Sequence, residues 1–92
     1  MQITKGNNII ILFSRTAYLG EIMKITDSKS LGQIIRERRK ELNYTQAYLS
    51  DFTGFSVTFI SDLERGKPTA EIEKTIQLIN VLGLDLLVER RG

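Results

Sequence analysis

The segment Thr45–Lys67 decides the fold, and its sequence is TQAYLSDFTGFSVTFISDLERGK. It contains two helical patterns of about two turns each, separated by Gly54. Helices this short form only if their unpaired terminal amides find acceptors, and Thr45 and Ser56 stand where such N-caps are needed. Gly54 stands where the first helix must end in a left-handed residue, a conformation that glycine adopts without steric cost. The segment therefore predicts two short helices joined by a tight glycine turn.

The two expected helices have different faces. In the first, the apolar residues predict a buried face made of Ala47, Tyr48, Leu49 and Phe52. In the second, Ile60 and Leu63 lie three residues apart and are expected to face inward. The outward side then carries Val57, Thr58, Ser61 and Asp62. An exposed flank on the second of two short helices is the arrangement by which a helix-turn-helix contacts base edges.

These residues resemble the phage repressor/Cro-type helix-turn-helix, also called the XRE class. The usual pattern of that class is Thr-Gln-x-x-Leu-Ala in the first helix, Gly at the turn, Ser before the recognition helix and Ile-Ser-x-x-Glu-x-Gly at its end. The chain matches these markers, with Ser50 in place of the usual Ala. The resemblance extends over about Leu31 to Leu82. It implies a mainly α, four- to five-helix repressor-like DNA-binding domain.

The resemblance also implies roles for individual residues. Base-reading falls to Val57, Thr58, Ser61 and Asp62, with the first two leading because the start of a recognition helix touches base edges. The methyl groups of Val57 and Thr58 suit a thymine methyl, and Asp62 suits cytosine N4 unless it pairs with Arg65 instead. Phosphate contacts are expected from Gln46, Ser56, Arg65 and Lys67, with simple capping or solvation as the alternative. Arg39 and Glu64 are expected to form a structural ion pair.

Composition is consistent with this interpretation. The 92 residues make one small domain, and a net charge of +2 with a pI near 9.1 permits nucleic acid binding without requiring it. The chain has no cysteine and no histidine, so it lacks a disulfide framework, a thiolate zinc site and the commonest general base. We therefore expect a non-catalytic, cytoplasmic protein with no cofactor and no metal.

Two longer helices are expected around this segment. Leu31, Ile34, Ile35 and Leu42 predict a helix over 30–42 capped by Ser30. For its basic residues Arg36, Arg38 and Lys40, a solvated face and phosphate contact are equally weighted alternatives.

Pro68 is expected to stop the recognition helix, and Thr69 to cap a further helix. The core stripe of that helix is expected to be Ile72, Ile76, Ile79 and Leu82, with Gly83 at its end.

The residues after Gly83 form a strand-like run, Leu84–Glu89. A lone strand in a helical domain has unpaired backbone groups, which invite a second copy. We therefore predict a short C-terminal β-strand that pairs antiparallel across a dimer through Leu84, Leu86, Leu87 and Val88. The expected DNA-binding domain is then 23–83, followed by a dimerisation strand and basic tail, 84–92.

A repressor-type domain that ends Gly-Leu-Asp-Leu-Leu-Val resembles the HipB-like antitoxins, including the small y4mF-type regulators. That resemblance implies a homodimer that binds an inverted-repeat operator of its own operon and holds a HipA-type serine/threonine kinase toxin. A fold does not by itself fix the partner, and phage repressors and restriction–modification controllers use the same domain. A regulator of either kind is therefore an alternative. A further alternative is a protein-interaction module that neutralises a toxin with little DNA reading.

Residues 1–22 form an N-terminal extension. Its apolar run Asn7–Phe13 is too short to span a bilayer and lacks a signal-peptide cleavage site, so no membrane association is expected. The run is either an extra strand or disordered arm, exposed unless it pairs with the C-terminal strand or a partner, or part of a stretch that is not natively translated. The second alternative arises because Leu19–Met23 can be encoded by a purine-rich sequence resembling a ribosome-binding site. We hypothesise that Met23 is the native initiator.

Overall fold

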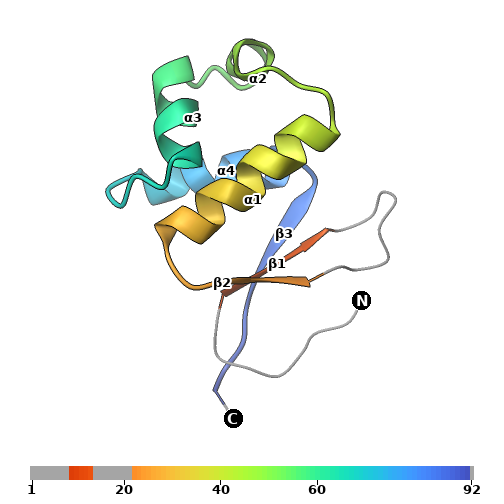
Figure 1. The fold of residues 1–92 in the computed structure, drawn as a ribbon, viewed down its shortest axis with the longest axis vertical. Helices are drawn as coiled ribbons and strands as arrows, with labels where there is room; N and C mark the ends of the chain where they lie inside the picture. Colours follow the sequence, from red (N-terminus) through yellow and green to blue (C-terminus); the bar gives the residue numbers. More distant parts are fainter. Residues whose placement is uncertain (1–8, 14–21, 92) are drawn as a thin grey trace.

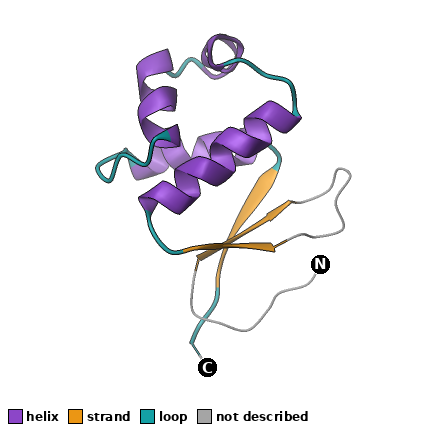
Figure 2. Cartoon of the chain, viewed as in Figure 1, coloured by secondary structure: helices purple, strands orange, loops and turns teal. Residues whose placement is uncertain are grey.

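The structure is a computed structural model that describes residues 9–13 and 22–91. The elements in chain order are β1 (Ile9–Phe13), β2 (Ile22–Ile25), α1 (Ser28–Glu41), α2 (Gln46–Thr53), α3 (Val57–Glu64), α4 (Ile72–Val81) and β3 (Leu84–Val88). The four helices gather at one end and the strands cross beneath them (Figures 1 and 2). The expected mainly α, four-helix architecture is confirmed. No helix among the described residues combines the length and apolar character that crossing a bilayer requires.

The local signals of the Thr45–Lys67 segment are confirmed. The Thr45 hydroxyl accepts from the Tyr48 amide at 2.9 Å, and the Ser56 hydroxyl accepts from the Phe59 amide at 3.0 Å. Gly54 has φ +82°, the left-handed conformation predicted for the end of α2. The segment is therefore two capped helices with a glycine turn between them.

The sheet differs from the prediction. Its order is β2-β1-β3 and both pairings are antiparallel, with Ile9 opposite both Ile25 and Val88. The C-terminal strand is thus paired within the chain, and the premise that it lacks an internal partner was wrong. Of the alternatives for the N-terminal run, Ile9–Phe13 forms a strand, while 1–8 and 14–21 lie outside the described residues. This pairing joins segments more than seventy residues apart (Phe13 with Leu84), so no local pattern announces it.

The bounds of α1 differ slightly from the expected helix. It begins at Ser28 because Asp27, not Ser30, is the N-cap: its carboxylate accepts from the Ser30 amide at 2.8 Å. The Ser30 hydroxyl accepts in turn from the Asp27 amide, which completes a capping box. At the other end, Leu42 is the C-cap and not the last helical residue.

The end of α3 and the start of α4 also differ from the predicted positions. α3 ends at Glu64, and the chain turns at Gly66 with φ +88°, so the helix stops before Pro68. α4 starts at Ile72, where the N-cap Glu71 makes no side-chain capping bond, and Thr69 is not the cap. Gly83, with φ +77°, ends α4 as predicted.

Among the described residues, one hydrophobic core is formed jointly by the four helices and by β2 and β3. Its buried members are Ile25, Ile34, Ile35, Leu49, Ile60, Leu63, Leu78, Ile79, Leu82 and Leu84. The inward residues of α3, Ile60 and Leu63, are as predicted. Their burial fixes how α3 is rotated about its axis, and therefore which of its side chains reach solvent.

Two predicted faces are only partly buried. On α2, only Leu49 enters the core, while Ala47 is exposed and Tyr48 and Phe52 keep 50% and 65% of their surface. A two-turn helix presents few positions to the core, and the aromatic rings pack on each other instead, with 6.2 Å between centroids. On α4, Ile79 and Leu82 are buried but Ile72 and Ile76 are exposed. The helix is rotated so that Thr75 and Leu78 take the inward positions.

Candidate nucleic-acid interface

The outward flank of α3 is the centre of the candidate interface. Val57, 43% exposed, and Thr58 occupy its first turn and face solvent. Ser61 and Asp62 follow one turn later and are half-buried. The structure thus places all four predicted base-reading residues outside the core, with the first two most accessible.

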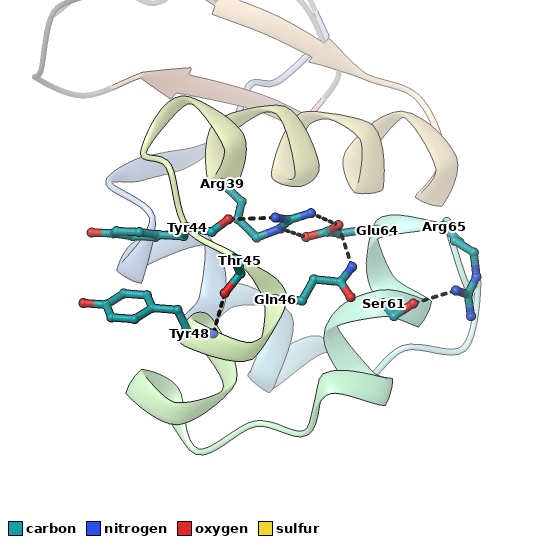
Figure 3. Close-up of polar contacts among 8 residues, drawn as sticks. All are labelled: Arg39, Tyr44, Thr45, Gln46, Tyr48, Ser61, Glu64 and Arg65. Carbon is teal, nitrogen blue, oxygen red and sulfur yellow. Dashed lines mark hydrogen bonds and ion pairs between the residues drawn. The ribbon is translucent and has the colours of Figure 1, made fainter.

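A buried ion pair fixes the angle of α3. Arg39 of α1 meets Glu64 with two parallel hydrogen bonds, Nε to Oε2 at 2.6 Å and Nη2 to Oε1 at 2.9 Å (Figure 3). Arg39 also donates to the Tyr44 carbonyl at 2.8 Å. The hydrogen bonds to Glu64 raise the pKa of Arg39, against an opposing effect of burial. The predicted structural pair is present, and it joins α1, the turn before α2 and the end of α3.

Gln46, expected at a DNA phosphate, is engaged within the protein. Its amide nitrogen donates to Glu64 Oε1 at 3.1 Å (Figure 3). As the first residue of α2, it connects the start of that helix to the end of α3. The Glu64 carboxylate therefore has donors from two helices, which is what a buried charge requires.

Basic residues at the end of α3 converge on Asp62. Arg65 donates to Asp62 Oδ1 at 2.7 Å and to the Ser61 hydroxyl at 2.5 Å. The ammonium of Lys67 lies 3.6 Å from Asp62 Oδ2. The alternative in which Asp62 pairs with Arg65 is thus realised. Arg65 and Lys67 themselves remain exposed beside the reading flank, where phosphate contacts are expected.

Arg38 lies neither in solvent nor at a phosphate-binding surface. Only 3% of its surface is exposed. Its Nε donates to the Leu82 carbonyl at 2.9 Å, and its Nη1 lies 3.2 Å from Glu41. It therefore caps the C-terminal end of α4, a favourable place for a cation. Sequence signals existed, because Arg38 stands three and four residues after the inward-facing Ile35 and Ile34.

Arg36 and Lys40, in contrast, are exposed. Arg36 borders a hollow of about 300 Å³ whose other lining residues are Gln46, Ser61, Glu64 and Arg65. Among the described residues Arg36 has no hydrogen-bond or ion-pair partner. Since Arg39 already neutralises Glu64 and Arg65 pairs with Asp62, the guanidinium of Arg36 gives the rim a positive charge.

The predicted dimerisation residues have distinct environments. Leu84 is buried in the core of its own chain, so its side chain is not available to a partner. Leu86 and Leu87 are half-buried, and Val88 keeps 74% of its surface. If β3 pairs with a second copy, as predicted, the side chains that remain available on it are Leu86, Leu87 and Val88.

Comparison with known proteins agrees with this geometry. The family described as Helix-turn-helix matches residues 35–88, more than half of the chain. The chain is 42% identical over 72 residues to the uncharacterized HTH-type transcriptional regulator y4mF of Sinorhizobium fredii, covering 74% of this chain and 95% of that protein. It is 32% identical over 62 residues to the ImmF control region 10 kDa protein of Bacillus phage phi105, covering 67% and 69% respectively.

Solved structures share the fold. A HipB complex with the O4 20mer superposes with a TM-score of 0.66 at 20% identity, covering 72% of this chain and 93% of that chain. A complex of a HipB variant with the O2 20mer gives 0.68 at 20% identity, covering 74% and 94%. At this identity the likeness concerns the fold. The family match over residues 35–88 and the 42% identity to y4mF show that the chain belongs to the XRE-type helix-turn-helix family of transcriptional regulators.

Proposed function

We propose that this protein is a sequence-specific DNA-binding repressor that inserts α3 into the major groove. The observation that carries the proposal is the exposed flank of α3, held at a fixed angle by the buried Arg39–Glu64 pair. Val57 and Thr58 lie at the start of that helix, where recognition helices meet base edges. Recognition requires such a preset orientation, because a helix free to rotate would lose its register with the bases.

Basic and capping residues around α3 would hold the DNA backbone. Lys67 and Arg65 flank the end of the helix, and Ser56 lies at its N-terminus, where backbone amides favour an anion. Gln46 and Arg36 border the hollow beside α3 that Arg65 also lines. Such contacts carry most of the affinity and make it steeply dependent on salt.

The repressor is proposed to act as a homodimer. β1 occupies one edge of β3, and among the described residues no strand occupies the other. A second copy pairing there would bury Val88 and satisfy the backbone groups that an edge strand leaves open. Two recognition helices related by a two-fold axis require half-sites about one duplex turn apart, roughly 34 Å, in an inverted repeat.

The finer biological role we propose is that of an antitoxin in a HipBA-type system, regulating its own operon and binding a HipA-type kinase toxin. The shared fold of the HipB complexes supports this role, and the relative y4mF supports the part of it that concerns transcriptional regulation. The alternative of a phage-type regulator finds support in the relative from phage phi105. The exposed rings of Tyr48 and Phe52 favour a protein-binding role beside or instead of DNA reading.

The test is selection of duplexes from a randomised library by the full chain, followed by affinity measurements over a range of salt concentrations. We expect an inverted repeat to be enriched. Lys67→Ala should weaken binding to all sequences alike and lower the salt slope by about one, since it removes one phosphate contact. Lys24→Ala is the matched control, because Lys24 is exposed and belongs to β2. β2 is part of the sheet at the other end of the molecule from α3 (Figure 1). Failure to enrich any sequence would contradict the proposal and favour the protein-interaction alternative.

A further inference from the structure

Resting on the proposed function, we infer that α3 recognises thymine through the methyl groups of Val57 and Thr58. Ser61 and Asp62, by contrast, position Arg65 and do not contact bases. This separates the predicted base-reading residues into two pairs with different tasks. The separation follows from which polar groups on α3 are already engaged.

Both oxygens of Asp62 face cations of the protein. Oδ1 accepts from Arg65 at 2.7 Å, and Oδ2 lies 3.6 Å from the Lys67 ammonium. Ser61 accepts from the same guanidinium. Accepting from cytosine N4 would bring this carboxylate close to DNA phosphates, whereas beside Arg65 and Lys67 its charge is already balanced. The cluster instead holds Arg65 toward the backbone of the duplex, as a positioning contact would.

The first turn of α3 offers few polar groups. The hydroxyl of the N-cap Ser56 accepts a hydrogen bond from the Phe59 amide, so this hydroxyl is already engaged within the helix. The remaining outward side chains are Val57 and Thr58, both exposed. Neither carries the amide or guanidinium that reads adenine or guanine by paired hydrogen bonds. Besides the single hydroxyl of Thr58, what they present are methyl groups, and in the major groove the thymine C5-methyl is the apolar group that such side chains contact.

These methyl groups are held rigidly. Val and Thr are branched at Cβ, so few rotamers are open to them in a helix and little side-chain entropy is lost on contact. The turn beneath them is supported by Phe59, which packs edge-on against Phe55 at 5.5 Å between centroids. Burying one methyl group is expected to change affinity by about fourfold.

The experiment uses the duplex that the full chain selects from a randomised library, with each thymine replaced in turn by deoxyuridine, which lacks only the methyl group. The wild type should lose about fourfold in affinity at one or more thymines placed symmetrically in the two half-sites. If the protein binds its selected duplex equally well after every replacement, methyl recognition is wrong while sequence-specific binding stands. If no duplex is selected, the proposed function fails first and this inference fails with it.

Matched variants assign the contacts. Thr58→Val keeps the methyl group and loses the hydroxyl, so the uracil penalty should persist; Thr58→Ser keeps the hydroxyl and loses the methyl, so the penalty at one thymine should vanish. Val57→Ala removes both γ-methyl groups, so it should lower the penalty at the thymine that Val57 contacts. Asp62→Asn should leave the base preference at every position unchanged. The reverse pattern for the Thr58 pair, or a relaxed preference for cytosine in Asp62→Asn, would overturn the assignment.

Discussion

The bidentate contact between Arg39 and Glu64 is the residue-scale feature on which the orientation of α3 depends. Both side chains are almost fully buried, so neither charge is stabilised by bulk water. We expect Glu64→Ala to lower the free energy of unfolding by about 3–5 kcal/mol, because it leaves the Arg39 guanidinium buried without its counter-charge. Urea denaturation followed by circular dichroism measures this loss.

The double variant Arg39→Met/Glu64→Leu is the control for that prediction. It removes both charges and fills the space with apolar side chains, so it should cost far less than the two single losses added together. A double variant whose cost equals their sum would show that the two side chains act independently, against the paired role given to them.

Asp27 is expected to make stability depend on acid pH. Hydrogen bonds from the Ser30 amide, and secondarily from its side chain, lower the pKa of the Asp27 carboxyl below its ordinary value. A carboxylate with a lowered pKa stabilises the fold above its unfolded pKa of about 3.9, and this contribution disappears as the pH falls through the folded pKa. Asp27→Asn keeps an N-capping oxygen but does not titrate there.

Thermal unfolding of wild type and Asp27→Asn at pH 6 and at about pH 2 checks this. The wild type should lose its advantage in Tm over the variant at the lower pH. A difference in Tm that stays constant between the two pH values would mean that the Asp27 charge plays no part in capping α1.

The roles of single residues could be predicted from the sequence where they depend on neighbouring residues in the chain. Thr45 and Ser56 bind amides three residues ahead, and Gly54 takes a left-handed conformation set by its own backbone. The Arg39–Glu64 pair was predicted from the family resemblance. The burial of Arg38 was missed, although its spacing from Ile34 and Ile35 indicated an inward position; its partner, the Leu82 carbonyl, depends on where the end of α4 lies in space.

At the scale of the elements, the close packing of α1 against the end of α3 restricts the size of the side chain at position 32. α1 passes so close to the end of α3 that a Cβ on Gly32 would overlap the Leu63 carbonyl oxygen and lie 2.8 Å from that of Glu64. We expect Gly32→Ala to lower the free energy of unfolding by about 1–3 kcal/mol, because overpacking against backbone outweighs the roughly 1 kcal/mol that alanine gains in helix propensity.

Gln33→Ala is the matched control, since it changes the neighbouring exposed position of the same helix and should be close to neutral. Denaturant midpoints of the two variants give the comparison. If Gly32→Ala were as stable as the wild type, the close approach of α1 and α3 would be wrong.

The helices were predictable as elements because their caps and apolar spacing lie within a dozen residues. Their faces were less so: α4 turns Thr75 and Leu78 inward where the sequence favoured Ile72 and Ile76. The sheet lay furthest from prediction. β3 was expected as a strand and is one, yet its pairing with β1 depends on contact between the two ends of the chain.

For the whole molecule, the fold places the candidate DNA-contacting helix at one end and the sheet at the other (Figure 1). The core fixes the rotation of α3 and the Arg39–Glu64 pair fixes its angle. In the proposed function, DNA reading by α3 and dimerisation through β3 use different surfaces. If β3 joins two copies, the separation of the two α3 helices is set by the rigid body between them. The dimer then binds only operators whose two half-sites are separated by the distance between the two α3 helices.

The most direct test is therefore the affinity of the full chain for its selected inverted repeat when about five base pairs, half a duplex turn, are inserted between the half-sites. The insertion places the half-sites on opposite faces of the duplex, where a rigid pair of α3 helices cannot reach both. The account predicts that affinity falls to that of a single half-site. Unchanged affinity after the half-turn insertion would contradict it.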